Sequence, residues 1–185
     1  GLVSHLIFAL AANPATAGSA LIGLQDNGTR IRSLSPSPNG PFNQIKGGDG
    51  FGVGWSQANQ ATVLATYVYN SISRATVNPP VNQSSFSAFT TGLPTPLGTT
   101  SGAKSNYYFV TPIITPTAAA DPTGTVFFTY GGSGTGPGGQ RIYKSGAIWW
   151  STIGASGSGG LSTGRFVRAT PHGLGIHPTD LNRIV

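Results

Sequence analysis

The 185-residue sequence contains no cysteine, no methionine and no glutamate, and charged residues make up only 8% of it. Without cysteine the chain can form no disulfide, no thiolate metal site and no thiol nucleophile. Helical bundles and coiled coils are rich in Ala, Glu, Lys and Leu, so the lack of glutamate argues against them. These absences exclude thiol chemistry and disfavour a mainly helical fold.

Positive charge exceeds negative charge because acids are scarce. Ten lysines and arginines stand against four aspartates, which gives a formal net charge of +6. The cations are scattered along the chain, with no more than two close together, as at Arg30/Arg32 and Arg165/Arg168. Nucleic-acid-binding surfaces are normally marked by a cluster of Lys and Arg. The pattern therefore predicts no nucleic acid partner and leaves room for polysaccharide or an anionic cell surface.

The rest of the composition is typical of an all-β protein with many turns. Hydrophobic residues make up 38% of the chain, and there are 28 glycines and 14 prolines. The apolar content argues against disorder, while Gly and Pro mark frequent turns. The low charge and the many Ser, Thr, Asn and Gln residues favour an extracellular, cell-surface or periplasmic protein of bacteria.

Residues 6–24 form a largely apolar segment of 19 residues without a charge. It contains Asn13-Pro14 and Gly18 near its centre, which a membrane-spanning helix disfavours, and it lacks the basic flank of a secretory signal. We expect two short strands around a turn, and no membrane span. The chain begins at Gly1 without a methionine, so we expect a processed product or a part of a longer protein.

A strand–turn–strand pattern recurs four times, at intervals of roughly 40 to 60 residues. Each copy places Pro, Asn, Asp or Gly between two apolar segments, where these residues favour a turn. The copies are 7–11 with 20–23, 51–55 with 62–65, 110–115 with 125–128, and 173–176 with 183–185. We expect Leu21, Val63, Val126 and Ile184 to occupy equivalent places in them.

Two further strands are predicted after each of the first three pairs, at 29–33 and 42–45, 67–71 and 86–89, and 141–145 and 149–153. Units of four short strands at this spacing are typical of β-propeller blades. The sequence thus predicts an all-β fold of about three blades plus the start of a fourth. We expect residues 1–185 to form one partial propeller region. Its approximate blades are 6–46, 51–90, 109–154 and 173–185.

Two glycine-rich motifs then carry a family resemblance. Residues 21–29 read LIGLQDNGT and residues 47–51 read GGDGF. This pair resembles the motifs of bacterial YVTN/BNR-like, sortilin-type β-propeller proteins, a superfamily that includes xyloglucanase glycoside hydrolases. Residues 177–184 (HPTDLNRI) are similar to its Asp-Pro turn, and residues 142–149 (IYKSGAIW) to an Asp-box hairpin without its aspartate.

The resemblance implies a ring of seven or more blades, which this chain alone cannot close. It therefore implies partners: the remainder of the same propeller, in a longer polypeptide, or other protein subunits. The function expected is that of a non-catalytic scaffold or binding module. Two alternatives stay open, a xyloglucanase-type hydrolase fragment acting on polysaccharide and a structural subunit of an extracellular filament or complex.

Asp26 and Asp49 are the candidate catalytic residues, because a glycosidase needs two carboxylates across the scissile bond. Both also sit in strong turn sequences, Asp-Asn-Gly and Asp-Gly, so turn closure explains them as well. Asp121 and Asp180 lie in turn sequences too. With no other carboxylate in the chain, the sequence favours a structural role and a protein that is not an enzyme.

Other candidate sites are few. His5, His172 and His177 lack the spacing of a shared metal site, so we expect no metal and no cofactor. The aromatic residues at 107, 149 and 150 suit stacking on sugars or a protein interface, and Tyr107, Trp149 and Trp150 are the candidate ligand-binding residues. Asn27 and Asn82 each begin an Asn-X-Ser/Thr acceptor sequence for N-glycosylation.

Overall fold

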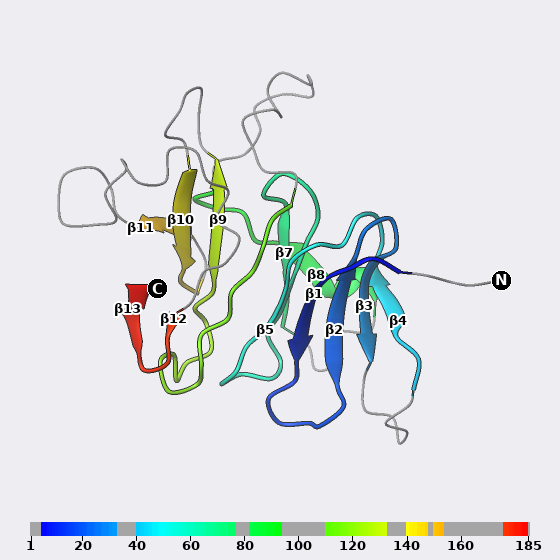
Figure 1. The fold of residues 1–185 in the computed structure, drawn as a ribbon, viewed down its shortest axis with the longest axis horizontal. Coiled ribbons are helices and arrows are strands. Elements are labelled where there is room, and N and C mark those ends of the chain that lie inside the picture. Colours follow the sequence, from blue (N-terminus) through cyan, green and yellow to red (C-terminus); the bar gives the residue numbers. More distant parts are fainter. Residues whose placement is uncertain are drawn as a thin grey trace.

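The computed structural model describes residues 5–32, 40–76, 82–93, 110–132, 140–147, 150–153 and 176–184. Within these ranges the chain forms thirteen β-strands and a single short 3-10 helix, η1 (Gln83–Ser85). The strands pair antiparallel in separate sheets that follow one another across the molecule (Figure 1). The predicted all-β class is confirmed, and the arrangement of the sheets as propeller blades stays a prediction.

The first sheet contains four strands paired in chain order: β1 (Ile7–Ala12), β2 (Ala20–Leu24), β3 (Gly28–Arg32) and β4 (Asn43–Lys46). All four predicted strands are confirmed to within two residues. The Asn13 side chain closes the β1–β2 turn by accepting the N–H of Ala15 at 2.9 Å. Pro14 has no N–H to donate, so it fits this turn and would not fit the ladder.

The second sheet also pairs in chain order, as β5 (Val53–Trp55), β6 (Val63–Thr66), β7 (Ile72–Ala75) and β8 (Phe86–Ala88). The strand predicted at 67–71 is wrong, since Tyr69 and Asn70 have positive φ of 55° and 60°. The Asn70 N–H donates to Thr111 Oγ1 at 2.9 Å, a contact from a distant segment. Residues 67–71 therefore form a turn, and the strand comes after it.

The third sheet has the order β9 (Phe128–Gly132), β10 (Gln140–Ser145) and β11 (Trp150–Ile153). Two isolated bridges, Val68 with Val110 and Ile114 with Phe128, stand where the strand 110–115 was expected. The predicted strand 125–128 begins at its last residue. The last two strands, β12 (Ile176–His177) and β13 (Asp180–Ile184), form a separate hairpin. Residues 173–175 of the expected first strand lie outside the described residues.

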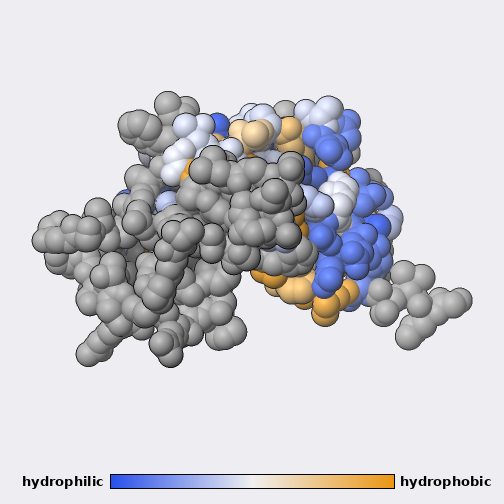
Figure 2. Space-filling model, turned by 90° about the horizontal axis from the view of Figure 1, so that it is seen from above, coloured by the Kyte–Doolittle hydropathy of each residue, from blue (hydrophilic) through white to orange (hydrophobic). Residues whose placement is uncertain are grey.

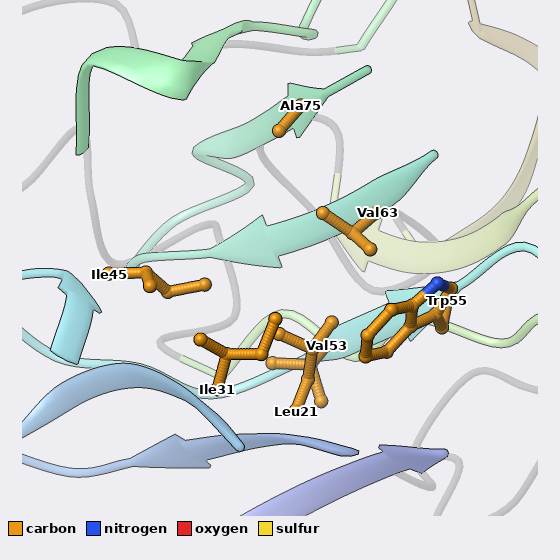
Figure 3. Packing of buried hydrophobic residues seen from close by; sticks show 7 residues of the cluster. All are labelled: Leu21, Ile31, Ile45, Val53, Trp55, Val63 and Ala75. Atoms are coloured by element: carbon orange, nitrogen blue, oxygen red, sulfur yellow. The ribbon is translucent and has the colours of Figure 1, made fainter. Parts of the chain in front are cut away.

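The strand β6, in the middle of the second sheet, is buried on both faces. Val63 packs towards the first sheet in a cluster drawn in Figure 3, which consists of Leu21, Ile31, Ile45, Val53, Trp55, Val63 and Ala75. Leu64, the next residue of β6, faces the other way and packs in a second cluster with Phe127, which precedes β9, and Tyr143 of β10. Because neighbouring strand residues point to opposite faces, one strand contributes to two cores. The sheets therefore stack face to face.

This packing corrects the expected equivalence of Leu21 and Val63. The two residues belong to one cluster between the first and second sheets. The Leu21 side chain therefore points towards the second sheet, and the Val63 side chain points towards the first. Leu64 is the counterpart of Leu21, since each points to the sheet that follows. Val126 precedes β9 and lies in no strand, whereas Ile184 pairs with Ile176 in the second strand of its hairpin.

Close backbone approach joins the first two sheets beside β2. A Cβ placed on Gly23 would lie 2.1 Å from the carbonyl oxygen of Phe51. The N–H of Gly50 donates to the Leu24 carbonyl at 2.8 Å in the same region. Only glycine at position 23 leaves room for this contact, because the opposing atoms belong to the backbone.

Replacing either of two fully buried threonines, Thr29 and Thr66, by valine should change the free energy of unfolding in opposite directions. Thr29 Oγ1 is buried and has no hydrogen-bond partner among the described residues, whereas Thr66 Oγ1 accepts from Gly52 N–H at 2.7 Å and donates to the Thr111 carbonyl at 2.9 Å. We expect Thr29→Val to raise the free energy of unfolding by about 1 kcal/mol and Thr66→Val to lower it by about 1–3 kcal/mol. Urea denaturation measures both, and equal signs would contradict these assignments.

Candidate functional site

The two candidate catalytic aspartates meet at the turn between β2 and β3. Asp49 Oδ1 accepts a hydrogen bond from the backbone N–H of Asp26 at 2.9 Å, across 23 residues of sequence. Asp49 is half-buried, while Asp26 is exposed. The fold thus joins the two resemblance motifs, QDNGT and GGDG, in one hydrogen-bonded turn.

Further contacts hold the backbone of this turn. Asp26 and Gly28 have positive φ of 60° and 71°. A Cβ on Gly28 would lie 1.9 Å from the Lys46 carbonyl oxygen, so glycine is required there. The Asn27 side chain donates to the Gln25 carbonyl at 3.2 Å, and Gln44 donates to the Asn27 carbonyl at 3.1 Å. The turn residues are therefore held by contacts within the turn and by contacts from β4.

This geometry has a specific chemical meaning for Asp49. A glycosidase requires one carboxyl group to give a proton and a second to act as base or nucleophile. The Asp49 carboxylate is already an acceptor for the backbone of the neighbouring turn, which is the role that Asp commonly has in turns.

Lys46 on the adjacent β4 strand is partly buried, and this burial lowers its pKa below the usual lysine value.

Asp121 is the most buried of the four carboxylates, with 5% of its surface exposed. It accepts the N–H of Thr123 at 3.2 Å, the hydroxyl of Thr123 at 2.6 Å and the N–H of Val126 at 2.7 Å. These bonds hold the residues before β9 in a turn, which is why the strand starts later than expected.

An Asp121→Asn substitution should be costly because the new amide group cannot replace both oxygens. One of the two positions would present an N–H to the donors of Thr123 or Val126. We expect the free energy of unfolding to fall by about 2 kcal/mol, in the range for a hydrogen bond to a charged group. Asp26→Asn makes the same chemical change at an exposed side chain and should be nearly neutral. Guanidinium denaturation of both variants checks the contrast.

The remaining aspartate and the histidines do not form a common site. Asp180 begins β13 and pairs with His177 across the hairpin turn, where the Thr179 N–H donates to His177 Nδ1 at 3.4 Å. His5 is exposed, and His172 lies outside the described residues. In the ranges that the structure describes, no three His, Asp, Cys or Glu residues gather as metal ligands would.

The predicted aromatic sites largely fall beyond what is described. Tyr107 and Trp149 lie outside the described residues. Trp150 belongs to β11, where its backbone pairs with Ser145, but its side chain is not described. Their proposed contact with a ligand stays a prediction.

Sequence reasoning missed an apolar surface on β1, the edge strand of the first sheet. Leu6, Ile7 and Leu10 are 62%, 56% and 64% exposed. Leu10 pairs with Ile22, and Ile22 with Arg30, so apolar and cationic residues share the face turned away from the second sheet. Figure 2, a view from above, shows apolar surface next to hydrophilic surface. The uncharged run at the N-terminus was the available signal.

The two glycosylation candidates lie in different surroundings. Asn82 is exposed at the N-cap of η1, where its side chain accepts the N–H of Ser84 at 3.0 Å. Asn27 is half-buried in the β2–β3 turn described above.

Comparison of the sequence with protein-family models and with curated proteins gives no match. The family resemblance therefore depends on the quoted motifs alone. Among the described residues, no helix has the length and apolar character needed to cross a membrane.

Proposed function

We propose that this chain is a non-catalytic, extracellular scaffold or binding module of the β-propeller type, and a portion of a larger secreted or surface protein. The observation that carries this proposal is the burial of β6 on both faces, with Val63 directed to the first sheet and Leu64 to the third sheet. Face-to-face stacking of four-stranded sheets is how propeller blades build a common core.

The use of the carboxylates also supports a scaffold. Asp49 and Asp121 accept hydrogen bonds from the backbone of turns. A rigid frame of this kind holds the connecting loops in place, and loops supply the contacts with partners in many folds.

The apolar surface of β1 is the proposed place of contact with a further sheet. Exposed patches of this kind commonly mark protein interfaces. Arg32 stacks on Phe42, with its guanidinium carbon 5.1 Å from the ring centre, and Arg30 donates to the Phe42 carbonyl at 3.3 Å. The remainder of the same propeller, or another subunit, would cover this face.

A polysaccharide assay separates the scaffold from the hydrolase alternative. The chain is incubated with β-glucans, and new reducing ends are measured alongside retardation in polysaccharide-containing native gels. We expect no release of reducing ends by the wild type, by Asp26→Asn or by Asp49→Asn, because Asp49 serves the turn. Release that disappears in Asp49→Asn, with an unchanged melting temperature, would establish the hydrolase instead.

The filament alternative is favoured by one observation, the exposed apolar edge strand β1. Unprotected edges invite pairing with other chains. Light scattering at increasing protein concentration decides this alternative: a stable monomer excludes assembly of identical copies through β1, and growth that Leu10→Lys abolishes supports it.

A further inference from the structure

The chain contains two Asn-X-Ser/Thr sequences, Asn27-Gly28-Thr29 and Asn82-Gln83-Ser84, and the structure distinguishes them. We propose that Asn82, and not Asn27, accepts an N-linked oligosaccharide on the folded chain. This assignment goes beyond the scaffold function and does not depend on which partner the scaffold binds.

All three residues of the Asn82 sequence are exposed. Asn82 Oδ1 accepts two hydrogen bonds from Ser84, one from its backbone N–H at 3.0 Å and one from its hydroxyl group. This is an Asx-turn, in which the asparagine carbonyl group is bound by the residue two positions later. The acceptor asparagine and the hydroxyl residue of the motif are therefore already in contact on the surface.

The Asn27 sequence is held differently at each of its positions. Thr29 is fully buried in β3, and its backbone pairs with Gly23. Gly28 packs closely against the Lys46 carbonyl group, with no room for a Cβ atom. The Asn27 side-chain amide nitrogen donates to the Gln25 carbonyl at 3.2 Å. The Thr29 hydroxyl is thus closed off from an enzyme unless the first sheet opens.

The contacts at Asn82 also favour the chemistry. Amide nitrogen is a poor nucleophile because its electron pair is delocalised into the carbonyl group. The two hydrogen bonds to Oδ1 stabilise the negative charge that this oxygen carries once Nδ2 loses a proton, so they make that proton easier to remove.

The donor required is an oligosaccharide joined to a polyprenyl pyrophosphate. Nδ2 of Asn82 forms a bond to sugar carbon C1, and the bond between C1 and the pyrophosphate oxygen breaks. The electron pair leaves with the pyrophosphate, and the Nδ2 proton passes to a base of the transferase.

The test uses the folded chain, a purified oligosaccharyltransferase that requires only Asn-X-Ser/Thr, and its lipid-linked oligosaccharide. Intact mass spectrometry should show a gain of one oligosaccharide, and peptide mapping should place it on Asn82. Synthetic peptides spanning each sequence should both be modified, because the difference between them lies in the fold.

Matched variants complete the experiment. Asn82→Gln and Ser84→Ala should abolish the mass gain, whereas Ser84→Thr and the control Asn27→Gln should retain it. Modification of the folded chain at Asn27, or equal modification at both sites, would overturn the proposal. A folded chain that stays unmodified at Asn82, whether or not the peptide is modified, would overturn it too.

Discussion

Trp55→Ala is expected to lower the free energy of unfolding by about 3–5 kcal/mol, the range for removing a large aromatic side chain from a core. Trp55 is fully buried in β5 and belongs to the cluster between the first and second sheets. Its indole N–H donates to the Gln60 carbonyl at 2.8 Å, so alanine removes a hydrogen bond as well as the ring. Guanidinium denaturation followed by circular dichroism measures the loss.

Two further variants show where the loss originates. Trp55→Phe keeps an aromatic ring but cannot donate to Gln60, so it should lose less than Trp55→Ala. Leu10→Ala removes an apolar side chain that is 64% exposed and should change stability by no more than about 0.5 kcal/mol. A Trp55→Ala loss as small as that of Leu10→Ala would mean that the first two sheets do not enclose a core.

Gly23→Ala is the second large expected effect, with a loss of about 3 kcal/mol, at the upper end of the usual cost of overpacking. The new methyl group would stand 2.1 Å from the Phe51 carbonyl oxygen and 2.9 Å from its carbon. A backbone cannot turn away as a flexible side chain can, so the two sheets must separate locally. Thermal unfolding should show a clear fall in melting temperature.

Gly47→Ala provides the matched control. Its new Cβ would meet only the end of the Gln83 side chain, at 3.9 Å, which is an ordinary contact. We expect its melting temperature to stay close to that of the wild type. If both variants melted alike, the close approach of β2 to the residues before β5 would be incorrect.

The first sheet could be predicted from sequence because its signals are local. Apolar residues of β1 and β2 flank Asn13-Pro14, and the Asn13 side chain closes this turn within two residues of itself. The turn at 67–71 could not be predicted in the same way. Its conformation depends on Thr111, 41 residues away from Asn70, while its own sequence begins with aromatic and β-branched residues, which favour a strand.

The sequence also could not predict which face of the sheet each β6 side chain points to. Val63 and Leu64 are both fully buried, so the strand carries no alternation between apolar and polar residues. A strand buried on both faces reads as a continuous apolar run, and nothing local says which residue faces which neighbour. This is why Val63 was expected at the place that Leu64 occupies.

For the candidate site, the sequence identified the turn motifs but not their contact. Asp-Asn-Gly and Asp-Gly are recognisable as turns by composition alone. The bond from the Asp26 N–H to Asp49 depends on how β4 returns along β3. The difference between Asn27 and Asn82 is also tertiary, since it comes from the burial of Thr29.

Methyl-selective NMR tests the stacking of the sheets most directly. We expect nuclear Overhauser contacts from the Val63 methyls to Leu21 and Ile31, and from the Leu64 methyls to the ring of Phe127. Contacts of both residues with one and the same sheet, or water contact at either of them, would contradict it.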